Sequence, residues 1–137
     1  MNEYRIIEFN KRDKELIEIL KKYSKINCRN ELDYGYISKS LDKTDVGFSF
    51  YDKYKPLAFI CVKIIDNSEL HVSIICSIKN TNNLGSQLLN IIINFAFNNK
   101  YKQITLECDD KLETFYNKFN FFTIKRYELN FIDMQSI

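Results

Sequence analysis

Hydrophobic and polar positions alternate with two different periods along the chain, and these periods predict a succession of strands and helices. Residues 4–9 have strand composition, and apolar residues then recur at helical spacing over 14–26. Asp13 precedes this run and belongs to the residue types that favour a helix N-cap. Residues 28–43 are less regular and predict either a short helix or an irregular loop, with Gly35 as a candidate breaker.

The middle of the chain predicts a β-hairpin that leads into a central strand. Residues 46–52 and 57–65 both have strand composition, and the turn between them contains Pro56, the only proline. A further turn precedes residues 70–76, which are almost all strand formers.

The central strand leads through a polar loop, residues 77–84, into a long apolar helix that is expected to begin at Gly85. The first backbone N–H groups of a helix lack intrahelical acceptors and lie at the positive end of its dipole. A strand that delivers such a helix end is typical of phosphate sites. The sequence therefore predicts an anion site here, with the diphosphate of a nucleotide-like cofactor as the expected ligand.

The last third of the chain again combines strands with a helix. Patterns predict a strand at 104–108, a helix at 112–119 preceded by Asp109 and Asp110, and strands at 121–125 and 129–134. The element order is therefore β α (α) β β β α β α β β, which indicates an α/β (α+β) protein with a mixed sheet. No linker or repeat interrupts it, so we expect one domain over residues 1–137.

Composition indicates a globular protein without a nucleic-acid or membrane partner. Charged residues make up 28 % of the chain, apolar residues 45 %, and the net charge is +2. This charge is too small to favour nucleic-acid binding, and no basic cluster exceeds a doublet. The longest apolar run is about half of a bilayer span, and a secretory signal pattern is absent. We therefore expect a cytoplasmic protein.

The cysteine pattern favours free thiols over a metal site. Cys28, Cys61, Cys76 and Cys108 form no CxxC motif, and no histidine lies at metal-ligand spacing from them. Three of the four lie in apolar strand patterns, where a thiol behaves as a small buried hydrophobe. This interpretation is favoured over a redox or nucleophilic role, and it predicts a reducing compartment and no metal.

Two segments resemble motifs of the GNAT (Gcn5-related N-acetyltransferase) family. The family's pyrophosphate loop reads Q/R-x-x-G-x-G/A, and residues 80–85 read NTNNLG. The family's later helix commonly reads A-x-x-F-Y-x-K-x-G-F, and residues 112–121 read LETFYNKFNF. Both segments stand in the family's order around the strand at 104–108. The resemblance covers essentially the whole chain and implies a mixed, mostly antiparallel sheet of six to seven strands flanked by about four helices.

The sequence departs from the family pattern at four positions. Asn80 stands where glutamine or arginine is usual, Asn83 and Asn120 stand where glycine is usual, and Leu112 replaces a small residue. Asparagine is the residue other than glycine that best tolerates positive φ, so the backbone shape of the loop is compatible with the family's.

The resemblance implies direct transfer of an acetyl group from acetyl-CoA, as cosubstrate, to the primary amine of a small molecule or peptide. The backbone of the central strand would pair with the pantetheine arm, and the loop and first helical turn would hold the diphosphate. The implied cofactor-binding residues are Ser73, Ile74, Ile75, Asn80, Thr81, Asn82, Asn83, Leu84, Gly85 and Ser86. We expect a monomer or a homodimer.

Three side chains are candidates for proton transfer. Tyr116 occupies the family's recurrent tyrosine position, which implies protonation of the leaving sulfur, although a packing role is equally open. Glu69 lies where some members carry a general base, and His71, the only histidine, shares its strand parity and therefore its face. A solvated carboxylate, a packed histidine and deprotonation through water are the alternatives. We expect segments 27–45 and 125–130 to line the acceptor side.

A second hypothesis treats the chain as a GNAT-like module that acts through CoA or protein contacts without catalysis, because of the substitutions in its motifs. A flavodoxin-like or other nucleotide-binding α/β protein is disfavoured. Hairpins precede the anion loop, and the dinucleotide-binding pattern GxGxxG is absent.

Overall fold

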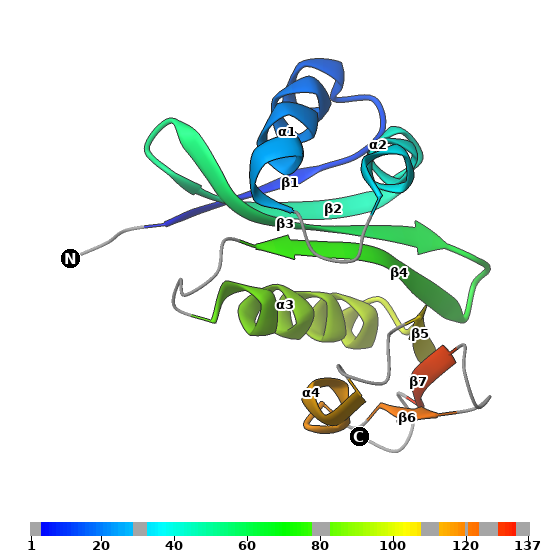
Figure 1. Ribbon diagram of the computed structural model, residues 1–137. Helices are drawn as coiled ribbons and strands as arrows, with labels where there is room; N and C mark the ends of the chain where they lie inside the picture. The colour runs from blue at the N-terminus through cyan, green and yellow to red at the C-terminus, as the bar shows by residue number, and fades with distance from the viewer. Residues whose placement is uncertain are drawn as a thin grey trace.

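A mixed sheet with helices on both faces forms the body of the molecule, as the computed structural model in Figure 1 shows. Within the described residues, the strand order is β1-β2-β3-β4-β5-β7-β6. Among the strands described, only β4 and β5 pair in parallel, and the other neighbouring strands are antiparallel. The predicted mixed α/β class is therefore confirmed. The structure describes residues 4–28, 33–77, 83–107, 113–119, 121–123 and 129–133.

The elements follow the order that the sequence predicts. They are β1 (Arg5–Phe9), α1 (Lys14–Asn27), α2 (Tyr34–Asp42), β2 (Val46–Asp52), β3 (Lys55–Ile64), β4 (Glu69–Ser77), α3 (Leu84–Asn98), β5 (Gln103–Glu107), α4 (Glu113–Asn117), β6 (Phe122–Thr123) and β7 (Leu129–Asp133). None of the described helices is both long and apolar enough to cross a membrane.

The segment that the sequence left open, residues 28–43, contains the helix α2, and Gly35 lies inside its first turn. Glycine costs a helix about 1 kcal/mol relative to alanine. Ile37 and Leu41, one helical turn apart, are 1 % and 0 % exposed. The burial of two such side chains contributes about 3–6 kcal/mol, which outweighs the glycine.

Asp13 occupies the N-cap position of α1, but its carboxylate does not cap the helix. Its Oδ2 atom instead accepts a hydrogen bond from the backbone N–H of Asn10, at 2.9 Å. The bond stabilises the turn that precedes α1.

The sheet separates two hydrophobic clusters. α1 and α2 cover one face, and α3 covers the other (Figure 1). The cluster under α1 and α2 consists of Phe9, Ile17, Leu20, Tyr23, Cys28, Ile37, Leu41, Phe59, Cys61, Ile74 and Cys76. The cluster on the α3 face includes Val62, Leu70, Val72, Leu84, Leu88, Ile104, Leu106, Tyr116 and Phe121.

β4 contains an extra residue that its hydrophobic pattern does not predict. Cys61 of β3 pairs with Ile74, but the next residue, Val62, pairs with Val72, so Ser73 is left without a β3 partner of its own. A bulge of this kind reverses the alternation of side chains along the strand. Under strict alternation the side chain of residue 73 would point to the same face of the sheet as that of residue 71. Because of the bulge, the side chain of Ile74 points to that face instead.

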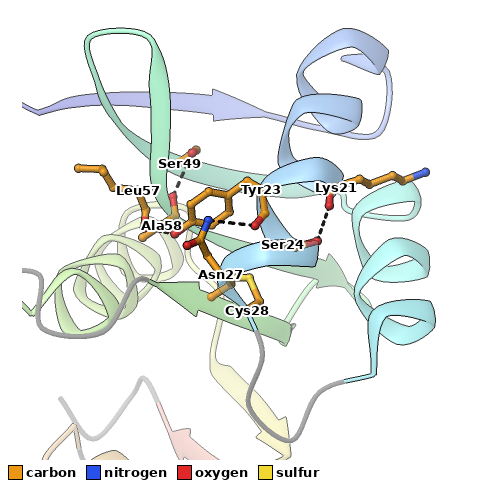
Figure 2. The surroundings of a disulfide bond; sticks show 9 residues. Lys21, Tyr23, Ser24, Asn27, Cys28, Ser49, Leu57 and Ala58 are labelled. Carbon is orange, nitrogen blue, oxygen red and sulfur yellow. Dashed lines mark hydrogen bonds between the residues drawn. A yellow bond between two sulfur atoms is a disulfide. The ribbon is translucent and has the colours of Figure 1, made fainter.

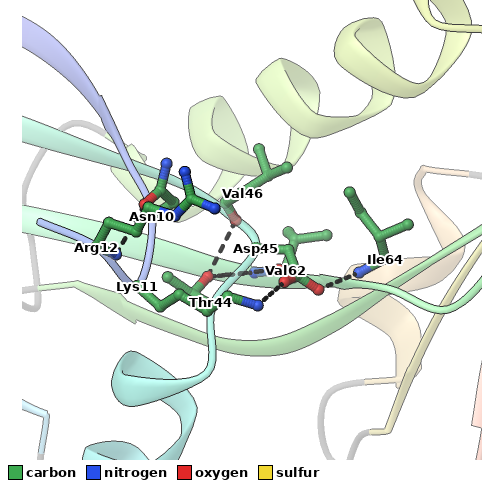
Figure 3. A network of polar contacts seen from close by, with 8 residues as sticks. All are labelled: Asn10, Lys11, Arg12, Thr44, Asp45, Val46, Val62 and Ile64. Carbon is green, nitrogen blue, oxygen red and sulfur yellow. Dashed lines mark hydrogen bonds and ion pairs between the residues drawn. The ribbon is translucent and has the colours of Figure 1, made fainter.

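A polar network fixes the end of β3 to the two connections that precede β2 and α1 (Figure 3). The buried Thr44 hydroxyl accepts a hydrogen bond from the Val62 N–H at 3.2 Å. The Asp45 carboxylate pairs with Lys11 Nζ at 2.8 Å and accepts from the Ile64 N–H at 2.9 Å. Burial alone would raise the pKa of Asp45, but the hydrogen bonds from Lys11 and Ile64 outweigh burial and hold the pKa below its ordinary 3.8.

The structure joins Cys28 to Cys76 by a disulfide, which corrects the prediction of free thiols for this pair (Figure 2). Their Cα atoms lie 5.5 Å apart, inside the range that a disulfide requires. The Tyr23 hydroxyl donates to the Leu57 carbonyl and so holds the last turns of α1 on the sheet. The Ser73 bulge turns Cys76 toward this helix.

Because two of the four cysteines form a disulfide, the argument for a reducing compartment from free thiols no longer holds. The cytoplasmic location stays a prediction.

The other two cysteines of the chain are Cys61 and Cys108. Cys61 is a free, fully buried thiol, as predicted. Burial raises its pKa to about 12, although a hydrogen bond with Thr44 acts in the opposite direction. Cys108 lies outside the described residues.

The disulfide should contribute measurably to stability. It spans 48 residues of sequence, and the chain-entropy model assigns a loop of that length about 4 kcal/mol. We expect dithiothreitol to lower the urea midpoint of the wild-type protein. The Cys28→Ser/Cys76→Ser double variant serves as the control, because its midpoint should not respond to the reductant. Equal midpoints of the wild-type protein with and without reductant would contradict the bond.

Candidate functional site

The centre of the candidate site is the edge of β4 that extends beyond its pairing with β5. The two strands pair in parallel from Glu69 with Gln103 to Val72 with Leu106. β4 continues to Ser77, but in the described part of the chain it has no further β5 partner. A strand edge offers backbone N–H and C=O groups to an extended ligand. The predicted pantetheine-binding residues Ser73, Ile74 and Ile75 all lie in this part of β4.

The bulge places these three residues in different surroundings. Ile74 is 3 % exposed and packs in the cluster under α1 and α2. Ile75 is half-buried and packs against the cluster on the α3 face. Because both side chains are engaged in packing, this part of β4 presents mainly its backbone to a ligand, which is the group that the predicted pairing requires.

The carbonyl of the bulged residue has a partner that sequence reasoning missed. The Tyr36 hydroxyl of α2 donates a hydrogen bond to the Ser73 carbonyl at 3.0 Å. The Tyr36 side chain is 44 % exposed. The contact joins α2, within the predicted acceptor-side segment 27–45, to the β4 edge. No pattern in the sequence pairs Tyr36 with residue 73, because the contact depends on the bulge.

The start of α3 lies beside the far end of β4. The helix begins at Leu84, one residue earlier than predicted, and Leu84 is 1 % exposed. A β-carbon at Gly85 would lie 3.8 Å from both Ile75 Cγ2 and Ser77 Oγ. The first turn of α3, which includes Ser86, therefore packs against the same strand end that precedes the predicted anion loop.

Asn83 adopts the left-handed conformation that the sequence predicts for it. Its φ and ψ angles are 54° and 40°, and its carbonyl accepts the first helical hydrogen bond, from Gln87, at 3.1 Å. Among residues other than glycine, asparagine is one of the few that adopt this backbone conformation routinely. The predicted loop residues Asn80, Thr81 and Asn82 lie outside the described residues.

The two predicted bases lie in one hydrogen-bonded group. Glu69 and His71 share a face of β4, as predicted, and the Thr105 hydroxyl lies between them. Thr105 Oγ1 donates a hydrogen bond to Glu69 Oε2 at 2.9 Å. His71 Nδ1 lies 2.8 Å from Thr105 Oγ1. Sequence reasoning missed Thr105, because its position depends on the parallel register of β5.

A tight turn fixes the start of β4 and therefore Glu69. The Asp66 carboxylate accepts hydrogen bonds from the N–H groups of Ser68 and Glu69, at 2.8 and 3.0 Å. The backbone N–H of Ser68, followed by its hydroxyl, lowers the pKa of Asp66 below its ordinary value. This turn holds the backbone of Glu69 while Thr105 holds its carboxylate.

Tyr116 lies in the hydrophobic cluster on the α3 face and is 9 % exposed. Its ring packs edge-to-face on Phe121, with centroids 6.0 Å apart. This contact supports the packing interpretation, and the protonation role stays a prediction.

Asp42, like Asp45, is an acidic residue of segment 27–45 that forms an ion pair. The Asp42 carboxylate pairs with Lys21 Nζ at 2.9 Å and so joins α2 to α1. The hydrogen bond to Asp42 is the main cause of the raised pKa of Lys21. Most of the other predicted acceptor-side segment, 125–130, lies outside the described residues. Among the residues that can be described, no group of three metal-ligating side chains occurs.

The left-handed backbone at Asn83 gives a test of the loop geometry. We expect Asn83→Gly to leave the free energy of unfolding nearly unchanged or to raise it, because glycine adopts this φ without strain. Asn83→Ala should lower it by about 1 kcal/mol, since alanine lacks the short polar side chain with which asparagine offsets the strain of the left-handed region. Urea denaturation of both variants measures the difference. An alanine variant as stable as the glycine variant would contradict the φ at this position.

Comparison with known proteins finds similar structures at low sequence identity. No protein-family model matches the sequence, and no curated protein matches it. An N-acetyltransferase from Staphylococcus aureus Mu50 superposes with a TM-score of 0.74 at 16 % identity, covering 97 % of this chain and 99 % of that one. The ribosomal-protein-S18-alanine N-acetyltransferase from Escherichia coli gives 0.74 at 13 % identity, over 96 % and 94 %.

A third solved structure contains a ligand. A GNAT-family N-acetyltransferase from Escherichia coli, in complex with CoA, superposes with a TM-score of 0.73 at 9 % identity, over 98 % of this chain and 83 % of that one. At these identities the similarity shows the fold, and the fold of this chain is that of the GNAT N-acetyltransferases.

Proposed function

We propose that the chain is a GNAT-family N-acetyltransferase that transfers an acetyl group from acetyl-CoA to a primary amine by direct attack. The observation that most supports this function is that, among the described residues, β4 continues beyond its pairing with β5 at Val72, with the first turn of α3 beside the end of β4. A structural neighbour that binds CoA has the same fold.

The cosubstrate would bind along the β4 edge and at the start of α3. The backbone of Ser73, Ile74 and Ile75 would pair with the pantetheine arm as an added strand. The diphosphate would bind the loop and the first turn of α3, where backbone N–H groups favour an anion. The residues proposed for that contact are Asn80, Thr81, Asn82, Asn83, Leu84, Gly85 and Ser86.

The proposed reaction needs a base, an oxyanion donor and an acid. A lysine-like amine is protonated at neutral pH, with a reference pKa of about 10.4, so Glu69 or His71 would first remove a proton. The amine nitrogen then attacks the thioester carbonyl, and a backbone N–H of β4 would stabilise the oxyanion. The C–S bond breaks as the intermediate collapses, and Tyr116 would protonate the departing thiolate.

The acceptor would approach from the side of α2. Tyr36 joins this helix to the β4 edge, so a bound amine would lie between α2 and the thioester. The chemistry allows a small-molecule amine or a peptide amine as the acceptor. The protein would act as a single acetyltransferase domain, as a monomer or a homodimer.

An alternative function is a GNAT-fold module that binds CoA or a protein without catalysis. The observation that favours it is the Asn83 side chain, which stands at the start of α3 where the family has glycine. A side chain there reduces the space for a diphosphate against the backbone.

Calorimetric titration with acetyl-CoA, with CoA and ATP as comparison ligands, tests the proposed function. We expect a Kd in the micromolar range, about −8 kcal/mol, for acetyl-CoA and weaker binding of ATP. A panel of amines with detection of released thiol then tests transfer. The absence of binding at millimolar acetyl-CoA would contradict the acetyltransferase function and leave a protein-binding role.

The Tyr116→Phe variant tests the proposed acid. We expect kcat to fall about 100-fold with little change in the KM for acetyl-CoA, because the hydroxyl would act only when the thiolate leaves. Tyr101→Phe is the matched control, since Tyr101 stacks on Phe95 at the cluster on the α3 face. Unchanged turnover of Tyr116→Phe would limit Tyr116 to packing.

A further inference from the structure

The backbone contacts of β3 show which of its peptide groups face β2 and which face β4. The Val62 N–H donates to the Thr44 hydroxyl at 3.2 Å, and the Val62 carbonyl accepts from the Asp45 N–H at 2.9 Å. Both partners lie in the connection that leads into β2, so the backbone groups of Val62 face β2. The Ala58 carbonyl has the same direction, because the Ser49 hydroxyl of β2 donates to it at 3.0 Å. In an antiparallel ladder the backbone groups of successive residues face opposite neighbours, so those of residues 58, 60 and 62 face β2 and those of 59, 61 and 63 face β4.

The pairing of β3 with β4 transfers this pattern to β4. Cys61 pairs with Ile74, so Ile74 directs its N–H and C=O to β3. Ile60 pairs with Ile75, and because the backbone groups of Ile60 face β2, those of Ile75 face away from β3. The N–H and C=O of Ile75 therefore lie on the side of β4 where β5 pairs earlier in the strand. In the described part of the chain, that pairing does not reach Ile75.

The bulge decides that Ile75, and not Ile74, has this orientation. Val72 pairs with Val62, whose backbone groups face β2, so those of Val72 face β5. In a regular strand the same orientation would return at residue 74. The inserted Ser73 moves it by one residue, to 75. The place of the bulge thus selects which backbone groups of β4 a ligand on that edge would meet.

One side chain contacts the inserted residue directly. The Tyr36 hydroxyl donates to the Ser73 carbonyl at 3.0 Å. An inserted residue is left out of the regular ladder, so a side chain can supply the hydrogen bond that its carbonyl needs. The next residue of α2, Ile37, is 1 % exposed and packs in the cluster under α1 and α2. The Tyr36 hydroxyl is therefore presented to the bulge from a helix that packing holds against the sheet.

We propose that Tyr36 is a positioning residue, whose bond to Ser73 fixes the bulge and so turns the N–H and C=O of Ile75 to the pantetheine arm of acetyl-CoA. This inference rests on the proposed function. Of the two residues after the bulge, Ile75 provides the backbone hydrogen bonds to the arm, because the groups of Ile74 are directed to β3. Tyr36 touches neither the thioester nor the amine in this role, and it acts through the backbone of β4.

The Tyr36→Phe variant keeps the ring and removes the hydroxyl. The side chain is 44 % exposed, so the variant should fold. We expect the Kd for acetyl-CoA, measured by calorimetry, to rise about fivefold, the effect of one hydrogen bond. ADP carries a diphosphate and no pantetheine arm, so its Kd should stay unchanged. An unchanged Kd for acetyl-CoA would overturn the inference, and so would an equal rise for both ligands.

Tyr23→Phe is the matched control, because it also removes a tyrosine hydroxyl that donates from a helix to a strand carbonyl. The acceptor of the Tyr23 hydroxyl is the Leu57 carbonyl of β3, so the β4 bulge is not involved. We expect both variants to lower the urea midpoint and only Tyr36→Phe to raise the Kd for acetyl-CoA. The same rise in Tyr23→Phe would assign the effect to lost stability and contradict the positioning role.

Amide hydrogen exchange of the free protein tests the bulge without a ligand. The Ile74 N–H faces β3 beside the bulge, so we expect it to exchange about fivefold faster in Tyr36→Phe than in the wild-type protein. The amides of β2 in the same sample are the reference, since a general loss of stability would accelerate them equally. Ile74 exchange that does not change relative to β2 would overturn the role of Tyr36.

Acetyl-CoA binding by the wild-type protein separates this inference from the proposed function. If the wild-type protein binds acetyl-CoA and Tyr36→Phe binds it equally well, the role of Tyr36 is overturned and the acetyltransferase function stands. If the wild-type protein does not bind at millimolar acetyl-CoA, the proposed function is overturned, and the pantetheine part of this inference with it. The exchange of Ile74 then decides by itself whether Tyr36 fixes the bulge.

Discussion

The single extra residue in β4, Ser73, determines to which face of the sheet the later side chains of this strand point. Before Ser73 in the chain, the side chain of His71 points to the face that α1 and α2 cover. After Ser73 the alternation of side chains between the two faces is reversed. Cys76 therefore reaches the end of α1, and Ile75 reaches the first turn of α3. Without the bulge, Cys76 would face α3, and the disulfide to α1 could not form. The bulged residue itself turns its carbonyl to Tyr36.

The parallel pairing of β4 with β5 has two consequences that meet at one place. Where the strands pair, their register brings Thr105 beside His71 and links it to Glu69. In the described part of the chain this pairing ends at Val72, and beyond it β4 has a backbone edge of the kind that an extended ligand can use. The hydrogen-bonded group of Glu69, His71 and Thr105 is adjacent to the part of β4 beyond Val72, because both belong to the same strand pair.

The α1 and α2 side of the molecule is fastened to the sheet by several independent contacts. The disulfide and the Tyr23 hydroxyl attach the end of α1, while the ion pair between Lys21 and Asp42 joins the two helices. A hydrophobic cluster fills the space beneath them. These contacts fix the helix that carries Tyr36, and a rigid support of this kind is what a site needs to hold an acceptor in a defined geometry.

The sequence alone determined the features that depend on local physics. Periods of two and 3.6 gave the order of strands and helices, and strand parity placed Glu69 and His71 on one face. The tolerance of asparagine for positive φ anticipated the left-handed conformation of Asn83. The mixed α/β class could be predicted for the same reason, because most of its elements have a periodic signal of their own. The motifs around residues 80–85 and 112–121 then indicated the family whose fold the solved structures share.

Only the tertiary structure decided the features that depend on residues far apart in the chain. Gly35 lies inside a helix because burial of Ile37 and Leu41 outweighs its local cost. The disulfide requires two segments 48 residues apart to meet, and the link through Thr105 requires the register of a parallel strand pair. A bulge leaves no periodic signal of its own. For these reasons the candidate side chains of the site could be predicted from the sequence. Their hydrogen-bonded arrangement could not, because it depends on how the strands pair in the folded sheet.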